Sequence, residues 1–241
     1  MKKIIPNAIT SANLLCGCIA VTQISEGNFI AASLLVLLGA FFDFFDGMAA
    51  RLLNVGSPIG AQLDSLADMV TFGLVPAYLI FNWLNEISPS NINFIAFLIA
   101  VFSAVRLAKF NVDERQSTSF IGLPTPANAL LWISIPLINW QLNNNYQLID
   151  LSVFQLLIEN KILLISLIVL FSFLLIAELP LLSLKFKTFG WKGNEYKAIL
   201  ILGSIIFMIL LYFAAIPFIL LLYIILSVLQ TSFNKTNEIQ S

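Results

Sequence analysis

DFFDGMAARLLNVGSPIGAQLDSLAD, residues 43–68, places four aspartates and one arginine between segments that are otherwise apolar. In the whole chain of 241 residues, 59% are hydrophobic and only 10% are charged. A charged side chain at the centre of a bilayer costs about 2.5 kcal/mol or more to insert. Acidic residues at the ends of apolar segments are therefore candidates for a functional site.

The overall composition is that of a membrane protein, and it argues against nucleic-acid binding and against any catalytic role for histidine. The mean hydropathy is +0.95, which is typical of a polytopic membrane protein. The net charge of −1 offers no basic surface, so we expect no nucleic-acid partner. The sequence contains no histidine. Carboxylates are therefore the main candidates for proton transfer and metal binding.

Apolar runs long enough to cross a bilayer, which takes about 17 to 25 helical residues, occur eight times. We therefore predict an all-α, polytopic integral membrane helical bundle of about eight transmembrane helices, folded as a single domain over residues 1–241. No internal repeat or soluble domain is visible. The predicted spans are 7–25, 28–52, 64–84, 92–110, 124–140, 161–180, 197–213 and 215–231.

The distribution of basic residues predicts the orientation. If the N-terminus is cytoplasmic, eight spans place eleven of the twelve Lys and Arg residues on the cytoplasmic side and only Lys161 outside, as the positive-inside rule requires. Asn7, Thr10 and Asn13 interrupt the first apolar run and no A-x-A pattern follows it, which favours a retained helix over a signal peptide. We expect a multi-pass protein of the cell (inner) membrane, with both termini and the aspartates facing the cytoplasm.

The four aspartates form two pairs with helical spacing. Asp43 and Asp46 are three residues apart and Asp64 and Asp68 are four apart, so each pair shares one face of its helix. The short connector LNVGSPIG places the two helices side by side, so the four carboxylates converge. Their mutual repulsion must be offset by protons or by a cation. Oxygen ligands favour a divalent Mg²⁺ or Mn²⁺ over zinc.

Small residues and one cation accompany the acids. Gly47, Ala50 and Gly60 permit close helix packing, or a close approach of a ligand to the backbone. Arg51 is placed either to meet a phosphate or to interact with the end of its helix. Asn7 and Thr10 lie on one face of the first span, where they either bond a neighbouring helix or contact a ligand.

The chain resembles the CDP-alcohol phosphotransferases, whose signature is filled here at every fixed position: Asp43-x2-Asp46-Gly47-x2-Ala50-Arg51-x8-Gly60-x3-Asp64-x3-Asp68. Members of that family move a phosphoryl-alcohol group from a CDP-linked donor to an acceptor hydroxyl. The resemblance implies that the signature aspartates hold divalent metal, with Asp68 also acting as the general base. It further implies nucleotide contacts from Asn7, Thr10, Gly47, Ala50, Arg51 and Gly60.

Flanking segments narrow the resemblance within this family. PNAITSANLLCG, VRLAKFNV and FIGLPTPANA resemble bacterial members that use CDP-diacylglycerol and L-serine, which implies these substrates, contact with membrane lipid and a homodimer. The resemblance is strongest over about residues 5–130, the expected catalytic core, and additional membrane helices are expected over about 161–231. The candidates to bind the donor phosphate or the serine carboxylate are Arg106, Lys109 and Arg115. Lys109 could equally serve as an anchor at the membrane interface.

Two alternatives stay open. Another acceptor, such as glycerol 3-phosphate, would use the same reaction class. An ion-coupled transporter would also place acids within a membrane, but such carriers often show matching halves. The acids here cluster in one predicted helix pair, which favours an enzyme.

Overall fold

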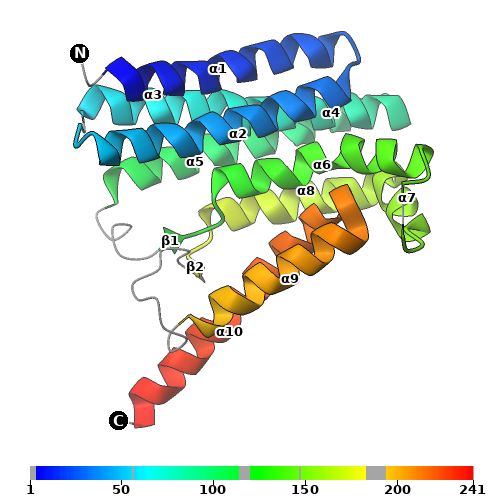
Figure 1. Ribbon diagram of the computed structural model, residues 1–241. Helices are drawn as coiled ribbons and strands as arrows, with labels where there is room; N and C mark the ends of the chain where they lie inside the picture. Colours follow the sequence, from blue (N-terminus) through cyan, green and yellow to red (C-terminus); the bar gives the residue numbers. More distant parts are fainter. Residues whose placement is uncertain (1–3, 56, 114–119, 147, 183–193, 241) are drawn as a thin grey trace.

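The computed structural model describes residues 4–55, 57–113, 120–146, 148–182 and 194–240. Almost all of these residues are helical, which confirms the predicted fold class (Figure 1). The elements in chain order are α1 (Ile4–Ser25), α2 (Phe29–Leu52), α3 (Pro58–Asp68), η1 (Met69–Leu74), α4 (Val75–Ile87), η2 (Asn91–Phe97), α5 (Leu98–Val112), β1 (Phe120–Ile121), α6 (Thr125–Asn143), α7 (Ser152–Glu159), α8 (Lys161–Ile176), β2 (Pro180–Leu181), α9 (Glu195–Leu211), η4 (Tyr212–Ala214) and α10 (Ala215–Gln240).

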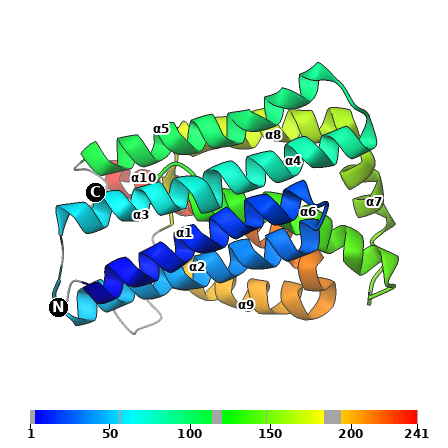
Figure 2. The ribbon, with the colours of Figure 1, turned by 90° about the horizontal axis from the view of Figure 1, so that it is seen from above.

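The first helices form a compact bundle with long axes nearly parallel. Helix α1 packs along α2 and against α3, while α5 lies beside α8 (Figure 2). Helices α9 and α10 form an antiparallel hairpin inclined to this bundle (Figure 1). The strands β1 and β2 make a two-residue antiparallel pairing, Phe120 with Leu181 and Ile121 with Pro180, that links the segment before α6 to the segment after α8.

Five helical segments in the described part of the chain are long and apolar enough to cross a membrane, and the bent pair α7–α8, with an angle of 80°, makes a sixth if counted as one span. The chain is therefore that of an integral membrane protein. The five segments are Ile4–Ser25, Phe29–Leu52, Pro58–Ile87, Asn91–Val112 and Glu195–Thr231.

This number is smaller than the eight predicted spans, although a helix occurs in each predicted range. The segment Glu195–Thr231 contains two predicted spans, because it reverses at η4, where Tyr212 has a φ of 51°. Helix α6 is not among the five segments because polar residues such as Asn139 and Gln141 lower its mean hydropathy. Gln141 has a structural role: its Oε1 accepts hydrogen bonds from the backbone N–H groups of Phe213 and Ala214 at the hairpin turn, at 3.0 and 3.4 Å.

Two predicted boundaries were wrong. The third span starts at Pro58 rather than at residue 64, because Ser57 caps the helix by accepting a hydrogen bond from the Gly60 N–H at 3.0 Å and proline suits the first turn. The sixth span ends at Ile176 rather than at residue 180, because Ala177 is extended and the chain continues into β2.

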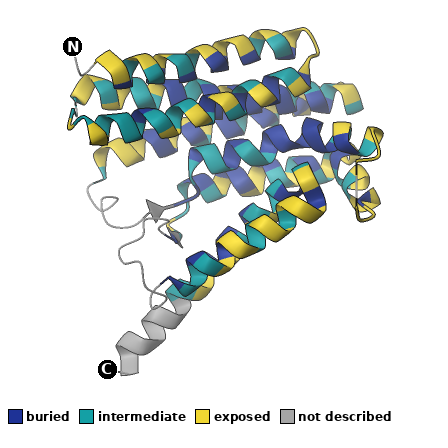
Figure 3. Cartoon of the chain, viewed as in Figure 1, coloured by how far each residue is buried: buried dark blue, intermediate teal, exposed yellow. Residues whose placement is uncertain are grey.

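Burial follows the packing of the bundle. The inward faces carry the buried side chains and the outward faces of α1, α2 and α9 carry many exposed ones (Figure 3). Trp132 of α6 is fully buried against Phe171 of α8, with ring centroids 6.2 Å apart. Trp83 of α4 donates from Nε1 to the carbonyl of Ile158 in α7 at 3.0 Å. Exposed apolar side chains such as Leu38 are those expected at a surface that contacts lipid.

Two glycines let α1 and α2 approach the helix that carries the later aspartates. A Cβ on Gly17 would lie 2.6 Å from Thr71 Oγ1, and a Cβ on Gly39 would lie 2.7 Å from Thr71 Cγ2. Thr71 belongs to η1, a π-helical stretch that follows Asp68 directly. Wide π turns often occur beside functional sites. The contacts of Thr71 therefore fix the position of the chain immediately after the aspartates.

Candidate active site

Three of the four signature aspartates form one carboxylate cluster. Carboxylate oxygens of Asp43, Asp64 and Asp68 all lie within 4.8 Å of one another. Asp43 comes from α2 and the other two come from α3, as the antiparallel arrangement predicted. Asp68 is buried and its two neighbours are half-buried. Like charges at this spacing require protons or a cation between them, and the set of oxygen ligands fits a hard divalent ion.

Asp46 lies beside this cluster and is held by the first helix. Its Oδ2 accepts a hydrogen bond of 2.6 Å from the Thr10 hydroxyl. Both side chains are buried, with 6% of Asp46 and 3% of Thr10 exposed. Asp46 is not part of the group within 4.8 Å, but it lines the same cavity as Asp64. The contact explains the polar residue at position 10 in an apolar helix.

A cavity of about 220 Å³ lies next to the aspartates. It is bounded by the first turns of α1, the last turns of α2 and the start of α3. A Cβ on Gly47 would meet nothing closer than 3.9 Å, so this helix surface is open to a ligand. A Cβ on Gly60 would lie 3.1 Å from Asn7 Oδ1, so this glycine permits a close approach of α3 to α1. Five of the six predicted nucleotide contacts line the cavity: Asn7, Thr10, Gly47, Ala50 and Gly60.

Arg51, the sixth predicted contact, is exposed in the last turn of α2. Its Nε donates a hydrogen bond of 2.9 Å to the carbonyl of Gly47, which itself lines the cavity. Of the two roles predicted for Arg51, the interaction with the end of its own helix is thus present in the structure. It uses one of the three guanidinium nitrogens and holds the side chain near the cavity.

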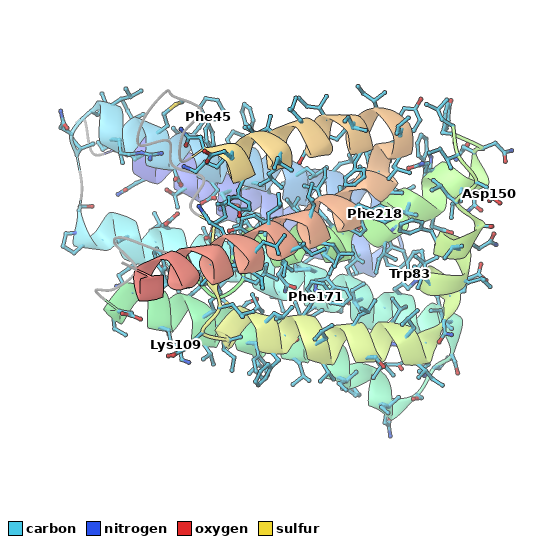
Figure 4. The ribbon with its side chains drawn as sticks, turned by 90° about the horizontal axis from the view of Figure 1, so that it is seen from below. Phe45, Trp83, Lys109, Asp150, Phe171 and Phe218 are labelled. Carbon is cyan, nitrogen blue, oxygen red and sulfur yellow. The ribbon has the colours of Figure 1, made fainter. Side chains whose placement is uncertain are left out.

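Three basic residues were predicted to bind the donor phosphate or the serine carboxylate, and they differ in position. Arg106 is buried in α5, with 7% exposed; its Nη1 donates to Thr125 Oγ1 at 3.3 Å, and it interacts electrostatically with Asp68. The direct contact of Arg106 is therefore with Thr125 at the start of α6, while Asp68 acts on its charge. Lys109 is exposed at the end of α5 (Figure 4), a place that suits an interfacial anchor. Arg115 lies outside the described residues.

One contact of the cluster was not predicted from the sequence. Asn13, fully buried in α1, donates from Nδ2 to Asp68 Oδ1 at 3.3 Å. The carbonyl of Asn13 in turn accepts a hydrogen bond of 3.1 Å from Thr71. The signal in the sequence was the repeat of polar residues with Asn7 and Thr10, but it did not identify a partner. Asn13 is thus a positioning residue for Asp68.

Comparison with known proteins identifies the class to which this fold and site belong. The family model described as CDP-alcohol phosphatidyltransferase matches residues 3–210, and the protein belongs to this family. The resemblance expected from the aspartate signature is therefore confirmed. The chain is a transferase of phospholipid synthesis, and family membership favours this class over an ion-coupled transporter.

Several relatives share one name, CDP-diacylglycerol–serine O-phosphatidyltransferase. The protein of Helicobacter pylori strain 26695 is 30% identical over 204 residues, which cover 84% of this chain and 81% of that protein. The protein of Bacillus subtilis strain 168 is 40% identical over 126 residues, 51% of this chain and 69% of the relative. That of Methanocaldococcus jannaschii is 36% identical over 143 residues, with coverages of 59% and 63%.

Proposed function

We propose that this protein is a phosphatidylserine synthase, which transfers the phosphatidyl group of CDP-diacylglycerol to the hydroxyl of L-serine and releases CMP. The observation that carries the proposal is the cluster of Asp43, Asp64 and Asp68 beside a cavity of about 220 Å³. The buried cation Arg106 interacts electrostatically with Asp68 of this cluster. The names of the three relatives support serine as the acceptor. The reaction is assigned to one membrane-embedded domain over residues 1–241, with its catalytic core in about 5–130.

The cavity is proposed to bind the nucleotide of the donor. Asn7 and Thr10 offer polar groups, and Gly47, Ala50 and Gly60 leave the backbone accessible. Arg51, held at the end of α2 by its bond to the Gly47 carbonyl, is placed to meet a phosphate. The acyl chains of the donor would then remain in the lipid beside the helices.

Mg²⁺ or Mn²⁺ is the proposed cofactor, held by Asp43, Asp64 and Asp68, with Asp46 as the fourth predicted ligand. When bound, the divalent ion would neutralise the pyrophosphate and make its phosphorus more electrophilic. The protein supplies the carboxylates in a fixed arrangement. Thr10 holds Asp46 and Asn13 holds Asp68, through bonds of 2.6 and 3.3 Å.

Asp68 is proposed as the base that takes the proton from the serine hydroxyl. The serine oxygen then bonds to the phosphorus that carries diacylglycerol, while the bond from this phosphorus to the oxygen of the CMP phosphate breaks. CMP leaves with that electron pair. The bond from Asn13 orients the Asp68 carboxylate for this transfer.

The supply of cations favours serine over a phosphorylated acceptor. Residues 4–55 and 57–113 contain three cations, Arg51, Arg106 and Lys109. At least one of them is needed for the donor pyrophosphate, which leaves few for a dianionic acceptor such as glycerol 3-phosphate. One buried arginine is sufficient for the single carboxylate of an amino acid.

The membrane arrangement is part of the proposal. Eight spans with both termini and the aspartate cluster on the cytoplasmic side would place the site where nucleotide and serine are available, and a homodimer is proposed from the family resemblance alone. A reporter fused after Ser241 should be active only in the cytoplasm. Activity only on the outer side of the membrane would contradict this orientation.

The function is tested with purified protein, CDP-diacylglycerol, Mn²⁺ and equal concentrations of L-serine and glycerol 3-phosphate. We expect phosphatidylserine and CMP in equal amounts, measured by mass spectrometry of the lipid and by chromatography of the nucleotide. A matched reaction with an Asp64→Asn variant should yield neither product. If phosphatidylglycerophosphate is the main lipid, serine is wrong as the acceptor while the reaction class stands.

A further inference from the structure

Among the described residues, two buried nitrogen donors on α5 and α6 have no hydrogen-bond partner. They are Nε of Arg106 in α5 and Nδ2 of Asn128 in α6. Arg106 is 7% exposed and Asn128 is fully buried. Leaving a buried donor unpaired costs free energy, more so for a charged group. Two such donors are a reason to look for a ligand.

Thr125 connects the two donors. Its hydroxyl accepts a hydrogen bond of 3.3 Å from Arg106 Nη1, and Asn128 follows it by three residues on the same face of α6. Arg106 also interacts electrostatically with Asp68, the proposed base. Arg106 and Thr125 therefore link α5 and the start of α6 to Asp68, and Asn128 lies one turn further along α6. The nucleotide cavity is lined instead by residues of α1, α2 and α3 and of the α2–α3 connector.

The direction of the Asn128 amide is determined by its neighbour. Nε1 of Trp132 can only donate, and it lies 3.1 Å from Asn128 Oδ1. The carbonyl oxygen of the amide must therefore face Trp132, which leaves the NH₂ group as the unpaired end. Trp132 is itself immobilised by full burial against Phe171. The donor is thus fixed in direction before any ligand binds.

We propose that Arg106 Nε and Asn128 Nδ2 form a subsite for the carboxylate of the amino-acid acceptor, which rests on the function proposed above. A carboxylate has two oxygens, one for each donor, and bonds of this kind are charge-assisted. The serine hydroxyl would then extend from this anchored end toward Asp68. An amino alcohol without a carboxylate leaves both donors unpaired, so the subsite selects against it.

The test replaces Asn128 and measures KM for each substrate separately. Asn128→Asp keeps the shape and the oxygen that accepts from Trp132 but loses the donor, and Asn128→Ala loses both. We expect KM for L-serine to rise about 10-fold to 100-fold in each variant, with KM for CDP-diacylglycerol unchanged. The preference for serine over ethanolamine, which is serine without its carboxylate, should fall by a similar factor. Asn139→Ala, on the same helix but away from the aspartates, is the matched control.

A second control separates binding from packing. Trp132→Phe removes the bond that orients the Asn128 amide but keeps its NH₂ donor, so it should lower the melting temperature and raise KM for serine by less than the Asn128 variants do. The subsite is refuted if the Asn128 variants keep the wild-type KM for serine, if they raise KM for the donor instead, or if Trp132→Phe reproduces their defect. A wild-type protein that makes no phosphatidylserine refutes the proposed function, and the subsite with it.

Discussion

Gly39 of α2 touches the two side chains that position Asp68, and its replacement by alanine tests that arrangement. A Cβ at this position would lie 2.7 Å from Thr71 Cγ2 and 2.9 Å from Asn13 Oδ1. Ordinary contact begins at 3.4 Å, so these atoms must retreat by about 0.7 and 0.5 Å. The Asn13 amide cannot retreat without moving relative to Asp68. We therefore expect Gly39→Ala to impair catalysis more than folding.

The size of the effect follows from the distances. The bond from Asn13 Nδ2 to Asp68 Oδ1 is already 3.3 Å long, so a further shift of half an ångström breaks it. Losing a hydrogen bond to a charged group costs about 1.5–3 kcal/mol. If this cost appears in the activation barrier, kcat falls about 10-fold to 100-fold. Overpacking should also lower the free energy of unfolding by about 1–3 kcal/mol.

The assay is CMP release at saturating substrates together with thermal melting in detergent. Gly203→Ala is the matched control: its new Cβ would lie 2.7 Å from Leu222 Cδ2, a flexible side-chain end in the hairpin of α9 and α10. This variant adds the same methyl group to a helix but should keep kcat within about twofold. If Gly39→Ala keeps the wild-type kcat, the proposed positioning of Asp68 by Asn13 is wrong.

Three further predictions concern other contacts. Asp64→Asn should abolish CMP release and weaken Mn²⁺ binding, measured by electron paramagnetic resonance, at least tenfold; unchanged Mn²⁺ affinity would contradict a metal role for the cluster. Thr10→Val should lower kcat/KM about 10-fold, because Asp46 loses its 2.6 Å bond; Thr10→Ser should retain most activity. The N–H of Ser152 donates to Asp150 at 2.9 Å and lowers the pKa of Asp150, at the turn labelled in Figure 4. Because the pKa is lower in the folded state, this contact stabilises the start of α7 at neutral pH and is lost as the pH falls through the lowered value. The protection of the Ser152 amide, which compares its exchange rate with the intrinsic rate at the same pH, should therefore fall in acid in the wild type, and Asp150→Asn should remove this loss of protection.

The aspartate cluster was predictable because local rules decide it. Helical spacing sets Asp64 and Asp68 on one face, and a short connector allows only an antiparallel return to Asp43. The small residues at positions 47 and 60 were predicted to permit either close helix packing or a close approach of a ligand, and both line the cavity. Here the sequence neighbours are also the spatial neighbours.

Contacts between distant helices were not predictable in the same way. Polar periodicity identified Thr10 and Asn13 but could not show that one reaches Asp46 and the other Asp68. The apolar run at 124–140 predicted α6, but it did not show that the polar Gln141 at the end of this helix pairs with the turn of the α9–α10 hairpin. A hydropathy average assigns such a residue to water or lipid, whereas its partner lies about seventy positions away.

The π-helical stretch Met69–Leu74 makes the register of this protein sensitive to single deletions. A π turn holds one residue more than an α turn, and each residue of an α-helix rotates the side chains by about 100°. Removing one residue between Asp68 and Val75 would convert the wide turn to an ordinary one. Either the acidic face of α3 or the buried face of α4 would then point in the wrong direction. We expect a chain shortened by one residue here to insert as a helix yet lose its chemistry, although no aspartate has been changed.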